Sequence, residues 1–387
     1  MTLDIAIVGG GIVGGSVACA LAGSGLRAAL IEPRPPAGLP AAGFDARVYA
    51  LSGRSREFLE QCGVWRYIDA GRVAPVREMQ VHGDGGAARL EFDAYRNGLP
   101  ELAAIVEEGN LQQAIRRALA DGEEVRLAGE AGCERIEWRA DMAQLALSDG
   151  SRIEARLVVG ADGAESKVRA AAGIGVRRRD YRQQGVVANF LADCPHGDIA
   201  RQWFREDGVL ALLPLPQGQV SMVWSTGDEH AAALLALAPA ELSDQVARAS
   251  AHCLGELRAA SPARAFPLRR MRADALIGAR LALVGDAAHN VHPLAGQGLN
   301  LGLADAEVLA GVLRGRGVRR DCGARALLRA YERSRKEDIL AMETVTDGLQ
   351  SLFASRLPGV AALRNAGLAL TDRLPPLKRY LVKRALG

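Results

Sequence analysis

Three acidic residues lie at or just after the ends of apolar stretches, where a side chain can bind the hydroxyl groups of a ligand. They are Glu32, Asp162 and Asp286. A carboxylate accepts hydrogen bonds from sugar hydroxyls. If the preceding stretches are strands of one parallel sheet, their carboxyl ends meet at one crevice. We therefore expect the three acids to border a single site for a large two-part cofactor.

A glycine-rich turn near the start of the chain is typical of dinucleotide binding. Gly9, Gly11 and Gly14 form the pattern GxGxxG directly after the apolar stretch 3–8. The first glycine permits a tight turn, the second lets the backbone approach a pyrophosphate, and the third brings helix and strand together. Glu32 follows about twenty residues on, where an acid binds ribose hydroxyls. These residues leave FAD and NAD both open as the ligand.

The stretch 285–300, GDAAHNVHPLAGQGLN, joins a predicted strand to a predicted helix and is the second candidate ligand loop. Backbone N–H groups in the first turn of a helix lack partners within it and lie at the positive end of its dipole. An electron-rich group near residues 298–300 is stabilised there. His289 and His292 are the candidates for acid–base chemistry in this loop. Neither has a companion at metal-ligand spacing, so no metal site is expected.

Composition excludes several classes of protein. The chain has 387 residues, with 49% hydrophobic, 24% charged and only 4% aromatic residues and a net charge of +3, which gives no reason to expect nucleic-acid binding. Six cysteines lie far apart without a CxxC pair, which argues against a zinc site, a disulfide framework or a dithiol redox pair. No apolar stretch is long enough to span a bilayer and no signal peptide precedes the first strand, so a cytoplasmic protein is expected.

The predicted elements give an α/β protein with two interleaved domains and a helical C-terminal region. A discontinuous Rossmann-like, cofactor-binding domain is expected at residues 1–70, 96–176 and 271–335. A β-sheet substrate domain is expected at 71–95 and 177–270, and the helical region at 336–387. Within the substrate domain, alternating apolar residues predict strands at 186–191, 200–204, 209–215 and 219–225. A helix is predicted after them, from about 239 to 257.

Together the motifs resemble those of the single-component flavoprotein aromatic hydroxylases of the p-hydroxybenzoate hydroxylase fold. They are GxGxxG with Glu32, GADGAESKVR at 160–169, and GDAAHNVHPLAGQGLNLG at 285–302. Within that fold, the chain is similar to the ubiquinone-biosynthesis hydroxylases. The similarity covers essentially the whole chain, including Asp-Ala-Arg at 45–47 and the C-terminal third.

The resemblance implies an FAD-dependent monooxygenase that uses NAD(P)H and O2 to hydroxylate the ring of a polyprenylated phenol. It implies that the ADP half of FAD is held by Gly9, Gly11, Gly14 and Glu32, with Arg47 near the pyrophosphate. Asp162 serves flavin and nicotinamide binding, and Gly285 and Asp286 contact the ribityl and phosphate region. The isoalloxazine ring is bordered by Pro293, Gly296, Gln297, Gly298, Leu299 and Asn300.

One departure and three alternatives qualify this expectation. Many relatives have arginine before the aspartate of the following helix, whereas this chain has Ala304-Asp305. The alternatives are an FAD-dependent hydroxylase of another aromatic substrate, an FAD-dependent isoprenoid reductase, and a flavin-holding scaffold protein of a biosynthetic complex. A halogenase is not favoured because the four tryptophans form no Trp-x-Trp motif, and a disulfide reductase is not favoured because no cysteines are close in sequence.

The stretch 373–387 is basic, has no acid, and places leucines at helical spacing. Such a segment lies on an anionic membrane surface, docks on a partner, or packs on its own domain. The implied substrate resides in the bilayer. We therefore expect weak peripheral attachment to the inner face of the membrane, or contact with partners of a ubiquinone-biosynthesis complex.

Overall fold

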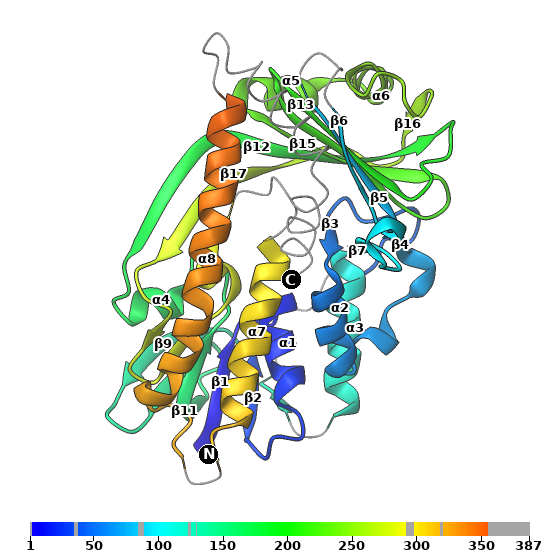
Figure 1. Cartoon of the computed structure of the whole chain (residues 1–387). Coiled ribbons are helices and arrows are strands. Elements are labelled where there is room, and N and C mark those ends of the chain that lie inside the picture. Colours follow the sequence, from blue (N-terminus) through cyan, green and yellow to red (C-terminus); the bar gives the residue numbers. More distant parts are fainter. Residues whose placement is uncertain are drawn as a thin grey trace.

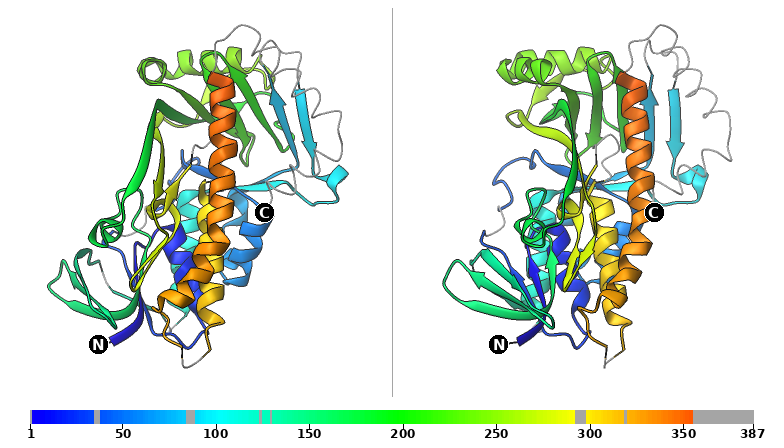
Figure 2. Two further views of the ribbon diagram at one scale, coloured as in Figure 1. Left: turned by 60° about the vertical axis from the view of Figure 1, so that its left-hand side comes forward. Right: turned by 90° about the vertical axis from the view of Figure 1, so that its left-hand side faces the viewer.

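The computed structural model describes residues 2–34, 38–83, 89–122, 125–128, 130–291, 298–317 and 320–354. Three sheets and the helices around them form two layers, with the N-terminal sheet at the bottom of Figure 1 and a second large sheet at the top. Long segments connect the layers, as the turned views in Figure 2 show.

The N-terminal sheet brings the three motif strands side by side. Its strand order is β18-β19-β11-β1-β2-β8, with parallel pairing from β19 to β8. The central strands are β1 (Thr2–Val8), β2 (Ala28–Ile31), β11 (Arg152–Gly160) and β19 (Leu281–Leu283). The edges are β8 (Val125–Leu127) and β18 (Ile277–Gly278), and β10 (Ala143–Leu147) and β9 (Cys133–Trp138) extend β11 antiparallel.

Helices and a small sheet complete this layer. Helix α1 (Ile12–Leu21) packs against α3 (Glu108–Asp121) and α7 (Gly298–Arg314). Apolar residues of these helices share one core with the central strands. Beside them, β3 (Val48–Leu51), β7 (Ala103–Glu107) and β4 (Val73–Val76) form an antiparallel sheet, with α2 (Gly53–Gln61) packed on β7. The short helix α4 (Lys167–Ala171) packs on β9.

The upper sheet has nine strands, with the order β20-β17-β12-β15-β14-β13-β5-β6 and β16 attached to β12. Its members are β5 (Glu78–His82), β6 (Arg89–Asp93), β12 (Val176–Ala192), β13 (Ile199–Arg205), β14 (Gly208–Pro214), β15 (Gln219–Gly227), β16 (Leu257–Ala259), β17 (Arg264–Ala273) and β20 (His289–Asn290). Helices α5 (Asp228–Ala236) and α6 (Pro239–Ala249) pack on one face and share an apolar core with it. Along each strand, successive side chains point to opposite faces of the sheet.

Two sequence predictions, one for a strand of this sheet and one for the helix α6 that packs on it, were wrong in their bounds. The strand predicted from residue 186 begins at Val176, because residues 176–184 pair with β17 as a ribbon that is largely exposed and so lacks apolar alternation. The helix predicted to residue 257 ends at Ala249, because Ala251 and His252 adopt positive φ angles of 54° and 51°. Buried leucines beyond that turn mimic the helical spacing, and periodicity alone cannot separate the two.

Helix α8 (Arg325–Ala354) spans both layers and is the long orange helix of Figure 1. It packs against α7 below, and Glu343 pairs with Arg272 of β17 at 2.8 Å above. The predicted domain boundaries stay a prediction. Of the segment 71–95, β4 pairs into the small sheet whereas β5 and β6 pair into the large one.

Among the described residues, no helix combines the length and apolar character needed to cross a membrane. In that same part of the chain, no three His, Cys, Asp or Glu side chains are grouped so as to hold a metal ion.

Candidate cofactor and substrate site

One cavity of about 1820 Å³ separates the N-terminal sheet from the nine-stranded sheet. Glu32, Asp162 and Asp286 all line it, together with the GxGxxG turn and the start of α7. The opposite wall of the cavity is one face of the nine-stranded sheet, and the side chains on this face are mainly apolar. Because a single drug-sized ligand occupies roughly 300–1,000 Å³, the cavity has room for a cofactor and a second ligand.

The glycine-rich turn has the geometry that a pyrophosphate needs. Gly9 has φ +107°, and a Cβ there would lie 2.2 Å from the Ala161 carbonyl oxygen. A Cβ on Gly14 would lie 2.0 Å from the Gly9 carbonyl oxygen. At Gly11, by contrast, no atom lies within 4 Å of the Cβ position, and this residue lines the cavity. The open backbone at Gly11 and the N-terminus of α1 form a cradle for an anion.

Glu32 is held in place by backbone N–H groups. The Gly10 N–H donates to Oε2 at 2.7 Å, and the Arg34 N–H donates to Oε1 at 3.1 Å. The side chain is 22% exposed and lines the cavity next to Gly11. Each carboxylate oxygen can accept a further hydrogen bond, so ribose hydroxyls have acceptors at this position.

Arg47 and Asp286 face the cavity at its cofactor end. The Arg47 guanidinium pairs with Glu108 at 3.5 Å and lies 5.4 Å from the centre of the Phe266 ring. The Asp286 side chain is exposed and lines the cavity, but the protein around it still buries its carboxylate from bulk water. This burial raises the pKa of Asp286, although His289, Arg47 and a hydrogen bond from Asn290 act in the opposite direction.

His289 belongs to the 285–290 loop, is buried, and does not line the cavity among the described residues. Its Nε2 is 2.6 Å from Oδ2 of Asp305, which is fully buried in α7. The Gly285 N–H donates to the same oxygen at 2.9 Å, and Arg335 Nε of α8 donates to Oδ1 at 2.8 Å. Asp305 thus fixes the loop that carries Asp286. Although this chain has alanine at position 304, where many relatives have arginine, Asp305 still has an arginine partner, Arg335 of α8.

Asp162 lines the cavity and also caps α4. Its carboxylate accepts from the Ser166 hydroxyl and from the Val168 N–H, the latter at 3.1 Å. Arg169 of α4 is buried and donates to the carbonyl oxygens of Ala164 and Ala287, both at 2.8 Å. Arg169 therefore ties the loop after β11 to the loop after β19.

The start of α7 is fastened to β3 and α2. Asn300 Oδ1 accepts from the Ser52 N–H at 3.0 Å, and its Nδ2 donates to the Ala50 carbonyl oxygen at 2.9 Å. Gly298, Leu299 and Asn300 all line the cavity. The other predicted residues of this loop, His292, Pro293, Gly296 and Gln297, lie outside the described residues.

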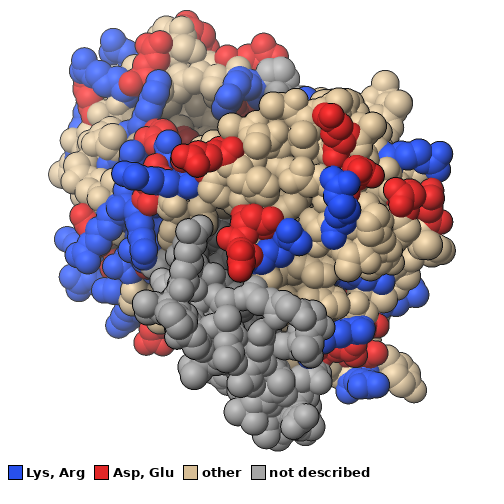
Figure 3. Space-filling model, turned by 90° about the horizontal axis from the view of Figure 1, so that it is seen from above, with Lys and Arg blue, Asp and Glu red and all other residues tan. Residues whose placement is uncertain are grey.

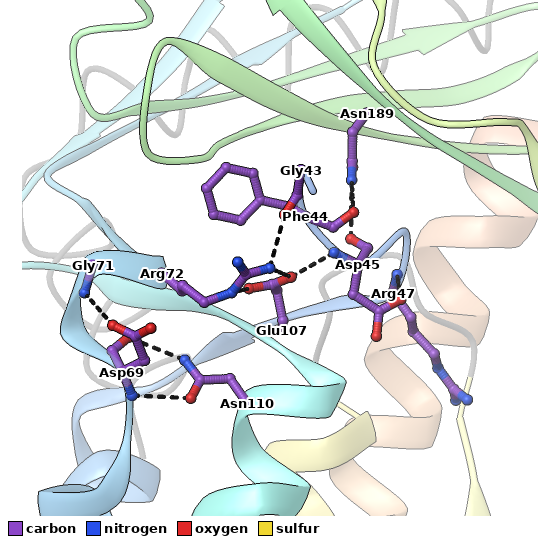
Figure 4. Close-up of polar contacts among 10 residues, drawn as sticks. All are labelled: Gly43, Phe44, Asp45, Arg47, Asp69, Gly71, Arg72, Glu107, Asn110 and Asn189. Atoms are coloured by element: carbon purple, nitrogen blue, oxygen red, sulfur yellow. Dashed lines mark hydrogen bonds and ion pairs between the residues drawn. The ribbon is translucent and has the colours of Figure 1, made fainter. Parts of the chain in front are cut away.

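A second buried network holds the 43–47 loop, as Figure 4 shows. Glu107 is fully buried and accepts from Arg72 Nε at 2.6 Å and Nη2 at 2.7 Å, and from the Asp45 N–H. From the nine-stranded sheet, Asn189 Nδ2 donates to the carbonyl oxygens of Phe44 at 2.9 Å and Asp45 at 3.0 Å. The loop that carries Arg47 is thus held by both layers of the molecule.

Sequence analysis did not find the residues that fix these loops. They are Glu107, Arg72, Asn189, Asp305, Arg335 and Arg169. Arg169 and Asp305 stood in or beside the quoted motifs, but the sequence assigned them no such role. The one available signal was a charged residue within an apolar periodic stretch, as at Asp305 between Leu303 and Ala306. A buried charge needs a partner, but its partner is not visible from the chain alone.

The residues present fit FAD. An open backbone cradle at Gly11, a ribose acceptor at Glu32 and the acids after β11 and β19 lie along one cavity that continues to an apolar sheet. This arrangement is that of a flavin-dependent aromatic monooxygenase.

The chain belongs to the family described as "FAD binding domain", whose model matches residues 2–346. It is 37% identical to ubiquinone hydroxylase UbiL of Rhodospirillum rubrum over 99% of this chain and 89% of the relative. It is also 37% identical to 3-demethoxyubiquinol 3-hydroxylase of Escherichia coli over 99% of this chain and 98% of the relative. The human mitochondrial ubiquinone biosynthesis monooxygenase COQ6 is 31% identical over 98% of this chain and 91% of its own.

Solved structures share the fold. PqsL of Pseudomonas aeruginosa, a probable FAD-dependent monooxygenase, superposes with a TM-score of 0.79 at 25% identity, covering 95% of this chain and 99% of its own. The p-nitrophenol 4-monooxygenase PnpA of Pseudomonas putida superposes with a TM-score of 0.79 at 19% identity, covering 100% of this chain and 99% of its own. The predicted fold class and cofactor are therefore confirmed.

Proposed function

We propose that this protein hydroxylates the aromatic ring of a polyprenylated phenol in ubiquinone biosynthesis, with FAD as cofactor and NAD(P)H and O2 as co-substrates. The observation that carries the proposal is the single cavity, which runs from the Glu32 and Gly11 cradle to an apolar wall of the nine-stranded sheet. Hydroxylases named for ubiquinone biosynthesis are similar to this chain over nearly its full length.

FAD, when bound, would supply the redox chemistry in which two electrons from NAD(P)H go to O2, one oxygen atom enters the ring and the other leaves as water. The chain's own residues bind the cofactor and orient the substrate ring. Gly9, Gly11 and Gly14 admit the pyrophosphate and Glu32 accepts from the ribose. The N-terminus of α7 at Gly298 stabilises negative charge placed against it. The apolar sheet excludes water from the reacting ring.

Within this proposal, Asp286 accepts from a ribityl hydroxyl and Arg47 lies near the pyrophosphate. His289 is a positioning residue, because its ring is buried against Asp305 and does not line the cavity. The assignments of Pro293, Gly296 and Gln297 to the isoalloxazine border stay predictions.

Product analysis with isotopically labelled O2 tests the function. The FAD-loaded protein is incubated with NADPH or NADH and a polyprenylated phenol, and the product is identified by mass. We expect nicotinamide oxidation that depends on the phenol, and one labelled oxygen in the ring. Reduction of the prenyl chain without oxygen incorporation would instead identify an isoprenoid reductase. Absence of turnover with any phenol would favour the flavin-holding scaffold.

We further propose weak peripheral contact with an anionic membrane surface. Exposed arginines on β12 and β17 outnumber the one acid within these two strands, Asp180, and Figure 3 shows basic side chains gathered on the side where these strands lie. They are Arg177, Arg178, Arg179, Arg182, Arg264 and Arg269. Each basic residue near such a surface contributes about 1 kcal/mol. The basic stretch 373–387 lies outside the described residues.

Co-sedimentation with anionic vesicles at low and high salt tests this contact. We expect salt-sensitive binding that weakens when residues 374–387 are removed, and again when Arg178 and Arg179 are replaced by glutamate, with FAD retained throughout. Full-length protein that ignores such vesicles at low salt would contradict the contact, and would leave the tail as a packing or protein-docking element.

A further inference from the structure

The cavity-facing side of the nine-stranded sheet contains an almost continuous apolar wall. One cross-strand row, set by the pairing of β12, β15, β14 and β13, consists of Val187, Val223, Ala211 and Gln202. The next row toward β6 lines the cavity with Leu213, Ala200, Met79 and Phe92. All eight side chains border the cavity, so a substrate ring that lies on this wall meets aliphatic groups on most sides.

Gln202 is the exception in this wall. It is 7% exposed, and it lines the cavity between aliphatic neighbours. The described part of the sheet gives the cavity two other polar side chains, at its opposite edge. Arg269 is 57% exposed and pairs with Asp180 at 3.8 Å, and Asn290 is hydrogen bonded to Asp286. Gln202 alone therefore places an amide against the apolar wall.

An amide is neutral and can both accept and donate. Its oxygen accepts from a phenolic hydroxyl, and its NH2 group donates to a methoxy or carbonyl oxygen on a ring. A carboxylate on the ring would lie against aliphatic side chains, with no cation from this part of the sheet to pair with it. Burial of an unpaired carboxylate in such a place is strongly unfavourable.

We infer that Gln202 binds a polar ring substituent of the substrate and that the apolar wall selects an uncharged, lipophilic phenol over a ring with a carboxylate. The inference rests on the proposed function, whose reaction it makes more specific. Gln202 orients the ring, and the apolar residues of the two rows hold its faces and the beginning of its hydrocarbon chain.

The chain offers a matched control in Gln80 of β5, the strand next to β13. Gln80 is 8% exposed, as buried as Gln202, but it points to the opposite face of the sheet, where its Nε2 donates to Glu78 at 2.7 Å. It does not line the cavity among the described residues. Replacement of either glutamine by leucine removes the same amide from the same sheet, and only one of them faces the cavity.

Binding to the FAD-loaded protein, followed through the flavin absorbance, tests the inference with a polyprenylated phenol and the matching polyprenylbenzene that lacks the hydroxyl. In wild type we expect the phenol to bind more tightly, by about five- to ten-fold for one hydrogen bond. In Gln202→Leu this preference is lost because the phenol binds more weakly, whereas Gln80→Leu retains it. A prenylated hydroxybenzoate binds weakly to all three proteins.

A merely structural role for Gln202 would weaken both ligands equally and leave their ratio unchanged, which would overturn the inference. Tight binding of the hydroxybenzoate to wild type would overturn the selectivity for an uncharged ring. Gln202→Met, which is close to glutamine in volume, repeats the test if the leucine variant loses FAD. The proposed function fails separately, if wild type binds the phenol with the expected preference and yet forms no hydroxylated product.

Discussion

Two loops border the cofactor end of the cavity, and a buried carboxylate holds each of them from behind. Asp305 holds the 285–290 loop and is surrounded by His289 and Arg335, whose side chains are only 1% and 2% exposed. Glu107 holds the 43–47 loop with a single cation, Arg72, whose side chain is 18% exposed. The Asp305 cluster is therefore dry, whereas water still reaches the cation of the Glu107 pair.

This difference predicts how each loop responds to loss of its carboxylate. Burial acts to raise the pKa of Asp305, but the contacts with His289 and Arg335 outweigh it and leave the pKa below its ordinary value. When the carboxylate of this buried cluster is removed, Arg335 is left without solvent around it and keeps only the exposed Asp338 as a counter-charge. Arg72 can regain water instead. We therefore expect the 285–290 loop to depend more strongly on its carboxylate than the 43–47 loop does.

The largest effect is expected for Asp305→Asn. Buried Arg335 loses its buried counter-charge and the His289 ring loses its carboxylate partner, so the free energy of unfolding falls by about 3–5 kcal/mol. Urea unfolding measures it. Asp338→Asn is the control, since Asp338 also pairs with Arg335 but is 57% exposed, and its loss changes stability by less than about 1 kcal/mol. Equal urea midpoints for the two variants would show that burial does not distinguish the two contacts.

Glu107→Gln should follow, with a loss of about 1.5–3 kcal/mol for hydrogen bonds to a charged group. Because the loop carries Arg47, the affinity for FAD should fall as well. Urea unfolding and FAD titration of the apoprotein measure the two effects. The exposed Glu60→Gln, which removes one of the two acidic partners of Arg56 on α2, serves as control and should change neither. A Glu107→Gln protein less stable than Asp305→Asn would reverse the comparison.

Asp286→Ala tests ligand binding by itself, because Asp286 is proposed to contact FAD, whereas Asp305 and Glu107 hold the loops from behind. Under the proposed assignment a ribityl hydroxyl loses its acceptor, a loss of roughly 1.5–3 kcal/mol, so FAD affinity should fall ten-fold or more. The apoprotein should unfold at no lower urea concentration than wild type, since the ionised Asp286 is disfavoured in the empty cavity. Wild-type FAD affinity in this variant would contradict the assignment of Asp286 to the cofactor.

The smallest effect is a difference in pH dependence between the two aspartates. The pKa of Asp305 is lowered in the folded protein, so its stabilising contribution is complete above the ordinary value of 3.8 and is lost as the pH falls through the lower folded value. The pKa of Asp286 is raised in the apoprotein, so its ionised form destabilises the fold above the raised value. That destabilisation is relieved as the pH falls.

Urea unfolding of the apoproteins between neutral and acidic pH measures how each aspartate's contribution to stability changes with pH. The stability gap between wild type and Asp305→Asn should stay constant down to about pH 4 and then close. Asp286→Asn should be slightly more stable than wild type at neutral pH, and this advantage should shrink on acidification. Parallel pH profiles for the two variants would show that the two aspartates do not differ in environment.

Local patterns in the sequence were sufficient to predict the main strands of the N-terminal sheet. The GxGxxG turn requires glycine because of backbone contacts within a few residues of the loop and with Ala161. The apolar stretches that become β1, β2, β11 and β19 are continuous because parallel strands are buried on both faces. Their acids therefore come to the same edge of the sheet by topology alone, which is why the crevice was predictable.

The sequence also indicated the alternating strands of the upper sheet, but not their ends. Where β12 leaves the core and pairs with β17 as an exposed ribbon, no apolar period marks the strand. Where α6 ends, buried leucines continue at helical spacing through a turn of positive φ. Periodicity reports burial, and burial follows secondary structure only where one face of an element packs on a core.

Only the tertiary structure determined how the loops of the site are held. Asp305 meets Arg335 because α7 packs on α8, and Asn189 reaches the 43–47 loop because the two layers face each other. Gln202 and Gln80 are indistinguishable as residues in neighbouring strands, and the register of the sheet alone puts one in the cavity wall and the other on the opposite face. The sequence predicted the dinucleotide-binding turn, because most of the requirements on its glycines lie within that turn. Pairings between residues far apart depend on packing and register, which no local pattern encodes.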